Sequence, residues 1–246
     1  MHRGSRQHEA EKREHNKFGF RFSYIGSNLL IKPERPRNRH AGLASATTFA
    51  TKKEIAPATG YAQTDPYMVR KKVLLTGLMN PGEKYRNTRH NAGAMALDLI
   101  YPEADFRRAD ALESLLARVS TDDADLVLQK PETFMNLSGR AVQLAMRKFS
   151  ISASHLIVLH DEVELLPGEV RYKFAGGHKG HNGLRSIIAQ LGTADFHRIR
   201  IGVGRPADER GGIADFLLSH QPSTERAKPA PLQEALKLAF QAINSA

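Results

Sequence analysis

From residue 72 onward, short apolar runs alternate with longer stretches whose apolar positions recur at helical spacing. The apolar runs predict β-strands at residues 72–78, 115–120, 125–129, 155–160, 169–174 and 197–203. The stretches with helical spacing predict helices at residues 92–101, 137–149, 182–191 and 232–243. This alternation indicates an α/β fold: a single three-layer domain in which helices flank a mixed, mostly parallel, twisted sheet. Because no internal repeat is present, we predict one such domain over residues 68–246.

The first 67 residues lack a sustained period of either kind. They are rich in Arg, His, Asn, Thr and Ala, and only residues 18–31 carry enough apolar side chains to indicate a short strand or hairpin. A segment with so little to bury is expected to stay disordered. We therefore predict that residues 1–67 are a basic, disordered N-terminal extension.

Composition limits the class of protein. The chain has 246 residues, enough for one sizeable core, and it contains no cysteine. The lack of cysteine excludes a disulfide framework and a thiolate zinc site, and it favours a reducing, cytoplasmic setting. No apolar run approaches the roughly 18–20 residues that a membrane-spanning helix needs, so we expect no membrane partner.

Most of the positive charge lies in the N-terminal segment. Residues 1–67 hold 12 Lys and Arg against 6 Asp and Glu, whereas residues 68–246 hold 24 against 20. The folded part is only modestly basic, which is compatible with an RNA ligand and with many other functions. An organellar transit peptide is an alternative interpretation of the N-terminal segment, but Glu9, Glu11 and Glu14 make it too acidic for the usual type.

Residues 77–93 read GLMNPGEKYRNTRHNAG and contain the most informative polar cluster. An apolar strand ends in a turn that begins at Asn80, and His90 follows just before the first predicted helix. The histidine is thus presented at a helix N-terminus, above the C-terminal end of a buried strand. In open α/β sheets this edge is where ligands bind.

Further polar clusters also lie where apolar elements start or stop. Asn136 stands near the start of a predicted helix, and the strand at residues 155–160 runs into a His-Asp-Glu sequence with Asp161 in the middle. The glycine loop at residues 176–183 leads into the next helix and contains Asn182. Folded together, these ends would place a histidine, an aspartate and three asparagines around one cleft.

These segments resemble the bacterial-type peptidyl-tRNA hydrolases, from about Val73 to about Ser219. The motifs that carry the resemblance are GLMNPGEKYRNTRHNAG, KPETFMNLSG, HDEVELLPGEVRYKFAGGHKGHNGLRSI and FHRIRIGVGRP. Because these long motifs occur in the family's order with family-like spacing, the resemblance is highly specific. It implies hydrolysis of the ester that joins a peptide to the 3′ end of tRNA, which recycles tRNA in translation. It also implies peptidyl-tRNA as the partner, a monomer, and no cofactor.

Ester hydrolysis needs an activated water and stabilisation of the oxyanion, and neither requires a metal. His90 is the natural general base, because an imidazole titrates near neutral pH. The resemblance matches Asp161 to the carboxylate that orients this ring and stabilises its protonated form. Since no serine replaces the water in these motifs, direct hydrolysis fits better than a covalent acyl-enzyme. The alternative for His90 is a surface histidine that caps the following helix.

Asn80, Asn136 and Asn182 can each donate and accept hydrogen bonds without carrying a charge. The resemblance places Asn80 beside His90 in the catalytic centre, and it assigns Asn136 and Asn182 to the peptide and the tRNA 3′ end. The alternative is a structural role, because asparagine is a good helix N-cap and Asn136 and Asn182 each precede a predicted helix. Tyr85 either walls the cleft or packs its own loop.

The resemblance assigns a phosphate clamp for tRNA to Lys173 and Arg200, which both project from predicted strands. Contacts to phosphates suit a hydrolase that must accept many tRNAs. The alternative is that the two side chains lie on a solvated strand face. Residues 205–219 are expected to form a lid-like loop and a short helix near the cleft.

His178 and His181 stand three apart in the glycine loop and invite a metal interpretation. No carboxylate or cysteine nearby supplies a third ligand, and the expected chemistry needs no metal. We therefore predict no metal site.

Two other functions compete with the hydrolase. A non-catalytic RNA-binding relative, like the plant organellar intron-splicing factors that resemble this family, could keep the fold and even the site residues. The intact set of site residues favours the enzyme over this alternative. A generic esterase is disfavoured because the chain lacks a nucleophilic serine elbow.

Overall fold

The structure is a computed structural model that describes residues 24–25, 28–29, 70–121, 124–206 and 212–245. The chain divides into two compact units, Met1–Val69 and Arg70–Ala246. In the first unit, β1 (Tyr24–Ile25) and β2 (Asn28–Leu29) form a small antiparallel pair, within the stretch where a short strand or hairpin was expected. The disorder predicted for the remainder of residues 1–67 lies outside the described residues.

Seven strands of the second unit form one mixed sheet in the order β4-β5-β6-β3-β7-β9-β8. These strands are β3 (Lys72–Gly77), β4 (Arg107–Ala109), β5 (Ser114–Ser120), β6 (Asp125–Pro131), β7 (Leu156–Glu162), β8 (Val170–Phe174) and β9 (His197–Gly202). The inner strands β6, β3, β7 and β9 pair in parallel, whereas the pairings β4–β5, β5–β6 and β8–β9 are antiparallel. The predicted mixed sheet is confirmed, and its antiparallel pairings lie toward the two edges.

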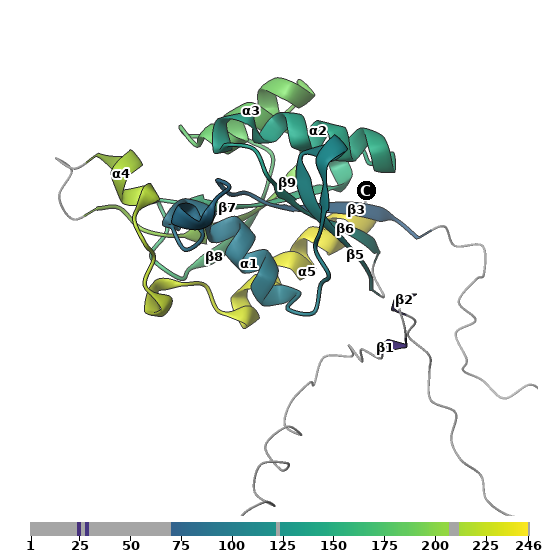
Figure 1. Cartoon of the computed structure of the whole chain (residues 1–246), viewed down its shortest axis with the longest axis horizontal. Coiled ribbons are helices and arrows are strands. Elements are labelled where there is room, and N and C mark those ends of the chain that lie inside the picture. The colour runs from purple at the N-terminus through teal and green to yellow at the C-terminus, as the bar shows by residue number, and fades with distance from the viewer. Residues whose placement is uncertain (1–23, 26–27, 30–69, 122–123, 207–211, 246) are drawn as a thin grey trace, which may run out of the picture. The chain divides into compact units, whose positions relative to one another are not determined.

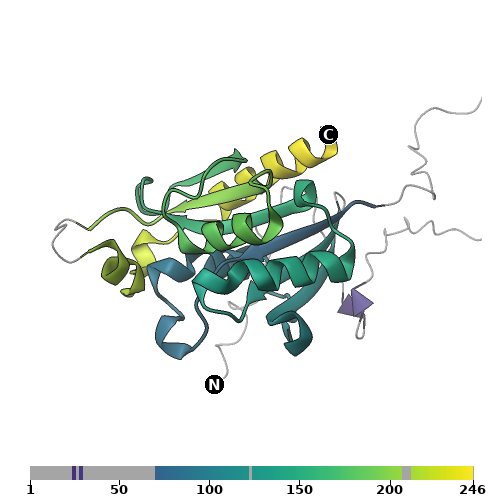
Figure 2. The ribbon, with the colours of Figure 1, turned by 90° about the horizontal axis from the view of Figure 1, so that it is seen from above.

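Helices cover both faces of this sheet, as predicted (Figure 1). They are α1 (Ala92–Ile100), α2 (Ser138–Phe149), α3 (Asn182–Leu191), α4 (Ile213–Leu218) and α5 (Pro229–Ser245). Helices α2 and α3 lie side by side on one face (Figure 2), and α1 and α5 lie on the other. None of the helices among the described residues is long and apolar enough to cross a bilayer.

Two elements differ from what periodicity predicted. Strand β4 has the sequence Arg-Arg-Ala and buries no residue, so its sequence has no apolar alternation from which a strand could be predicted. It forms because the edge of β5 offers unpaired backbone groups, with Arg108 opposite Leu115. Helix α4 has only six residues and likewise buries none of them, although the resemblance did lead us to expect a short helix there.

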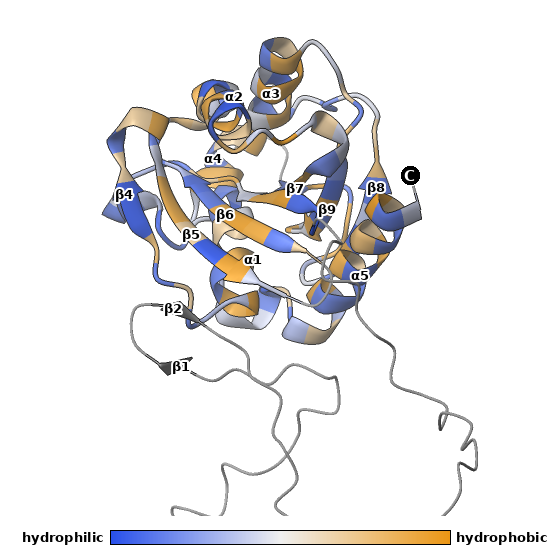
Figure 3. Cartoon of the chain, turned by 90° about the vertical axis from the view of Figure 1, so that its right-hand side faces the viewer, coloured by the Kyte–Doolittle hydropathy of each residue, from blue (hydrophilic) through white to orange (hydrophobic). Residues whose placement is uncertain are grey.

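The central strand β3 is apolar on both faces, as expected for a strand inside an α/β sandwich. Val73 and Leu75 pack into the core beneath α1 and α5, whereas Leu74 packs into the core beneath α2 and α3. All three side chains are fully buried. Figure 3 shows the same apolar concentration along the strands of the sheet.

Two glycines bring the start of α1 unusually close to the sheet. A Cβ atom added at Gly93 would lie 2.2 Å from the carbonyl oxygen of Leu159, and one added at Gly77 would lie 2.7 Å from the carbonyl oxygen of Gly93. The backbone at the start of α1 therefore packs directly on the backbones of β3 and β7, with no side chains in between. This contact holds the residues just before α1 above the C-terminal end of β7.

We expect a chain that begins at Met68 to fold like the full chain. Both core clusters and all seven strands of the large sheet lie within residues 70–245, so the truncated chain keeps the packing that stabilises the domain. Thermal unfolding followed by circular dichroism should give the two chains melting temperatures within about 2 °C of each other. A much lower value for the truncated chain would mean that residues 18–31 stabilise the domain.

Candidate active site

His90 and Asp161 meet where two elements end. His90 lies in the 3₁₀ turn Arg89–Asn91, directly before α1, and Asp161 is the penultimate residue of β7. The Nδ1 atom of His90 lies 2.9 Å from Oδ1 of Asp161. Both side chains are buried, with residue exposures of 8% for His90 and 3% for Asp161. His90 is therefore not a surface helix cap, and the turn residues make no side-chain cap bond to α1.

The hydrogen bond to a carboxylate determines which ring nitrogen of His90 is basic. An ionised carboxylate only accepts, so Nδ1 carries the proton and Nε2 keeps its lone pair. Burial alone would lower the pKa of His90, but the charge and hydrogen bond of Asp161 raise it above its ordinary value. Burial alone would raise the pKa of Asp161, yet the charges and hydrogen bonds of His181 and His90 hold it well below the usual range.

His181 completes this network and was not among the site residues predicted from the sequence. Its Nε2 atom lies 2.9 Å from the same Oδ1 of Asp161. Its Nδ1 atom accepts the backbone N–H groups of Gly183 and Leu184, at 3.1 and 3.3 Å, so His181 is the N-cap of α3. The cap makes Nδ1 an acceptor, and Nε2–H consequently donates to Asp161. The only sequence signal for this role was a histidine at the junction of a glycine loop and a helix.

Next to this network lies a histidine that stays neutral. His160 is buried, its Nδ1 lies 2.7 Å from the carbonyl oxygen of Asp161, and its ring meets that of His181 edge-on. Burial, together with a contribution from the neighbouring His181, lowers the pKa of His160 to about 3. It therefore adds no positive charge to the site at neutral pH.

Asn80 is held in one orientation by its neighbours. The side-chain amide of Asn91 accepts from the backbone N–H of Asn80 at 2.8 Å and donates to its carbonyl at 3.0 Å. The Oδ1 atom of Asn80 accepts the backbone N–H of Met135 at 2.8 Å. This bond fixes the amide, because the Met135 N–H requires an acceptor. The Nδ2–H₂ group of Asn80 remains as a donor without a partner among the described residues.

A cleft of about 560 Å³ opens beside these groups. Its lining includes Asn80, Tyr85, His90, Asn136 and Asn182, which are five of the residues that the sequence assigned to one site. Asn136 and Asn182 are exposed, and neither caps a helix: α2 has no side-chain cap, and the cap of α3 is His181. The structural alternative for these two asparagines, as helix caps, is therefore wrong.

A second, smaller cavity of about 310 Å³ adjoins the first, and His181, Gly180 and Leu217 line both. It holds Lys173 and Arg200 together with three further basic side chains, those of Lys179, Arg198 and Arg205. The Nε atom of Arg200 donates to the carboxylate of Glu162 at 2.9 Å. Lys173 and Arg200 thus face a cavity and not a flat solvated strand surface, and Arg200 is already partly neutralised.

One trio of possible metal ligands occurs in the part of the chain that the structure describes. It consists of His90, Asp161 and His181, whose candidate ligand atoms lie within 4.8 Å of one another. The same atoms bond each other in the network above, with both histidines as donors to Asp161. His178 is outside this trio, and its Nδ1 atom accepts the backbone N–H of Gly180.

Comparison with known proteins places the chain in a family. The family model for peptidyl-tRNA hydrolase matches residues 74–246. A peptidyl-tRNA hydrolase of Sorangium cellulosum is 48% identical over 176 residues, which cover 70% of this chain and 76% of the relative. One of Neisseria meningitidis is 40% identical over 172 residues, which cover 69% of this chain and 88% of the relative. The crystal structure of the enzyme from Acinetobacter baumannii is 30% identical, with a TM-score of 0.59 over 70% of this chain and 94% of that one. The chain therefore belongs to the peptidyl-tRNA hydrolase family.

Proposed function

We propose that this protein hydrolyses the ester bond between the peptide and the tRNA 3′ end in peptidyl-tRNA, in the cytoplasm and as a monomer. The observation that carries the proposal is the buried pair of His90 and Asp161, 2.9 Å apart beside the cleft. Family membership gives the class of substrate, and this pair gives the chemistry.

In the proposed reaction, Nε2 of His90 takes a proton from a water molecule as that water attacks the ester carbonyl carbon. The negative charge of Asp161 stabilises the imidazolium that forms. The tetrahedral intermediate then expels the ribose 3′ oxygen, which receives the proton from His90. The products are tRNA with a free 3′ hydroxyl and a peptide with a free carboxyl group.

The Nδ2–H₂ group of Asn80 supports stabilisation of the oxyanion. It is a neutral donor beside His90, and the backbone of Met135 on one side and the amide of Asn91 on the other hold its residue in place. A donor that is already oriented costs no reorganisation when charge develops on the carbonyl oxygen.

The remaining cleft residues are proposed to bind the two halves of the substrate. Asn136 and Asn182 lie on the walls with exposed amides, which suit a peptide backbone and the tRNA 3′ end. Tyr85 is half-buried and lines the same cleft. Lys173 and Arg200, in the adjoining basic cavity, are proposed to hold a tRNA phosphate.

Replacing either cation should impair the use of tRNA substrates. We expect Lys173→Ala and Arg200→Ala to raise KM for peptidyl-tRNA about 3- to 10-fold and to lower the slope of log affinity against log salt by roughly 0.7–0.9. Arg200→Ala should have the larger effect, because it also leaves the negative charge of Glu162 unpaired in the lining of the cavity, where this charge repels a phosphate. Steady-state kinetics over a salt series measures both quantities.

Arg171→Ala is the matched control, because Arg171 is an exposed neighbour on β8 that pairs with Glu169 and does not line the cavity. A peptidyl ester of a nucleoside, which lacks the distant phosphate, should be used equally well by all variants. Equal losses on both substrates would show that Lys173 and Arg200 support the site or the fold instead.

The function itself is tested by incubating the purified full chain with peptidyl-tRNA and measuring the release of free tRNA. We expect multiple turnovers by the wild-type chain. Binding of tRNA without release would favour the non-catalytic RNA-binding relative, since such a protein keeps the fold and the basic cavity but performs no hydrolysis.

A further inference from the structure

Arg89 precedes His90 in the chain, but its side chain bonds to a distant segment. It contacts residues 213–226, which we call the strap. Nη1 of Arg89 donates to Oγ of Ser219 at 2.7 Å and to the carbonyl oxygen of His220 at 2.8 Å. Arg89 is buried, with an exposure of 8%. The side chain of this buried arginine, next to the proposed general base, therefore donates hydrogen bonds to the strap.

Two further contacts use the charge and the flat face of the same guanidinium. Nη2 donates to the carboxylate of Glu225 at 2.8 Å. The guanidinium carbon lies 4.3 Å from the ring centroid of Phe216. An arginine can combine a forked set of donors with a face that stacks on an aromatic ring, which a lysine cannot do.

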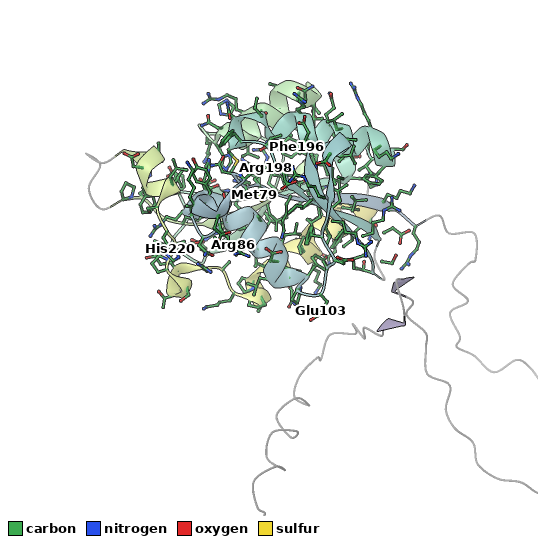
Figure 4. The ribbon with its side chains drawn as sticks, viewed as in Figure 1. Met79, Arg86, Glu103, Phe196, Arg198 and His220 are labelled. Atoms are coloured by element: carbon green, nitrogen blue, oxygen red, sulfur yellow. The ribbon has the colours of Figure 1, made fainter. Side chains whose placement is uncertain are left out.

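Backbone bonds join the same two segments. The N–H of Arg89 donates to the carbonyl of Ser219 at 3.1 Å, and the N–H of Gln221 donates to the carbonyl of Asn87 at 2.8 Å. Between them, Thr88 and His220 form an antiparallel bridge. Figure 4 labels His220 of the strap and Arg86 of the loop before Arg89, and the two lie on the same side of the molecule.

The strap also forms part of the cleft wall. Its helix α4 contributes Ala214, Leu217 and Leu218 to the lining, which also includes His90. Leu217 lines the basic cavity as well. Helix α4 has six residues and no fully buried side chain, so its position depends on contacts with its neighbours. Leu217 packs partly on the core, and Arg89 holds both Phe216 within the helix and Ser219 and His220 directly after it.

We propose that Arg89 is a positioning residue that seats the strap as a wall of the substrate cleft, so that Arg89 governs substrate binding while its neighbour His90 governs the chemical step. The proposal rests on the proposed function, because the binding it describes is that of peptidyl-tRNA. It differs from a general role in stability, because it predicts a change confined to the strap and to KM.

The first test replaces Arg89 by Lys and by Gln in the full chain. We expect KM for peptidyl-tRNA to rise about 10-fold in Arg89→Lys and further in Arg89→Gln, with kcat changed less than about twofold. Hydrogen–deuterium exchange followed by mass spectrometry should show faster exchange in residues 213–226, and unchanged exchange in β3 and β7.

The second test reaches the same contact from the other side. Ser219→Ala combined with Glu225→Ala removes two partners and leaves the catalytic loop intact. We expect the same rise in KM and the same faster exchange in the strap. Adding Arg89→Lys to this variant should raise KM by a smaller factor than it does in the wild-type chain, because two of the partners of Arg89 are already absent. Arg86→Ala is the control, since Arg86 is exposed in the loop before Arg89 and pairs with Glu83.

Several results would overturn the proposal. If Arg89→Lys lowers kcat at unchanged KM and leaves exchange in the strap unchanged, Arg89 acts on the His90 turn and not through the strap. Unchanged kinetics and exchange in both sets of variants would make the contact irrelevant to binding. If the wild-type chain releases no tRNA, the proposed function fails, and exchange together with tRNA-binding affinity still decides the role of Arg89.

Discussion

His90→Ala should lower kcat for peptidyl-tRNA hydrolysis by roughly 10²–10⁴-fold, because the variant has no general base to activate the water. The loss should appear in kcat with little change in KM, since the cleft walls remain in place. The fold should also persist, because His90 belongs to neither core cluster and its backbone is held by the close contact of Gly93 with β7. Single-turnover kinetics on peptidyl-tRNA would measure the chemical step directly.

His155→Ala is a suitable control for this variant. His155 ends the 3₁₀ turn Ala153–His155 before β7, at the opposite end of that strand from Asp161, and its side chain bonds to Ser152 and Ser154. We expect this control to keep normal turnover. Near-normal turnover in His90→Ala would exclude His90 as the general base and make His181 the next candidate.

Asp161→Asn should have the second large effect, a decrease in kcat of about 10²–10⁴-fold. Asparagine has nearly the same shape as aspartate but lacks the charge that stabilises the His90 imidazolium. Its amide can also donate to Nδ1 of His90, which would place the ring proton on Nε2 and leave no lone pair for the water. The affinity for tRNA should change little, because Asp161 is only 3% exposed, although it borders the basic cavity.

The same variant should shift the pH profile in a defined direction. In the wild-type chain, Asp161 raises the pKa of His90, so kcat/KM should fall as the pH drops through a value above the ordinary pKa of a histidine. Without the negative charge only the effect of burial remains, and burial lowers the pKa of His90. The acidic limb of the residual activity should therefore move to lower pH. A limb that stays in place would mean that another group titrates.

Asp195→Asn provides the control for charge, because Asp195 is an exposed aspartate outside the cleft lining. It should leave both the rate and the pH profile unchanged. If Asp161→Asn keeps a normal kcat, Asp161 has only a structural role, as the hydrogen-bond partner of His181.

The sequence predicted most of the fold because the signal is local. Val73, Leu74 and Leu75 of β3 form an uninterrupted apolar run, and α1, α2 and α3 each follow a strand along the chain. What it did not predict has no local signal. Strand β4 forms because β5 has a free edge. Its register, with Arg108 opposite Leu115, depends on β5 residues that follow the turn at residues 110–113.

The candidate site also has one part that the sequence predicted and one part that it did not. His90, Asp161 and the three asparagines were predicted from polar residues at the ends of apolar elements and from the resemblance to a family. For the residues at or after the C-terminal ends of β3, β6 and β7, proximity follows from a rule of topology, since parallel strands present their C-terminal ends at one edge of the sheet. Asn182 follows the antiparallel strand β8, and the glycine loop at residues 176–183 brings it to the same cleft. The roles of His181, Asn91 and Arg89 depend on partners that the chain order does not reveal.

The sequence by itself thus determined the fold class, the family and the residues suited to the chemistry, because apolar periodicity and long motifs are properties of neighbouring residues. Only the tertiary structure decided which nitrogen of His90 is basic, how Asn80 is oriented, and that Arg200 shares its charge with Glu162. Each of these depends on one hydrogen bond between residues 38 to 71 positions apart. A hydrogen bond requires a distance and a direction, and the folded chain alone supplies both.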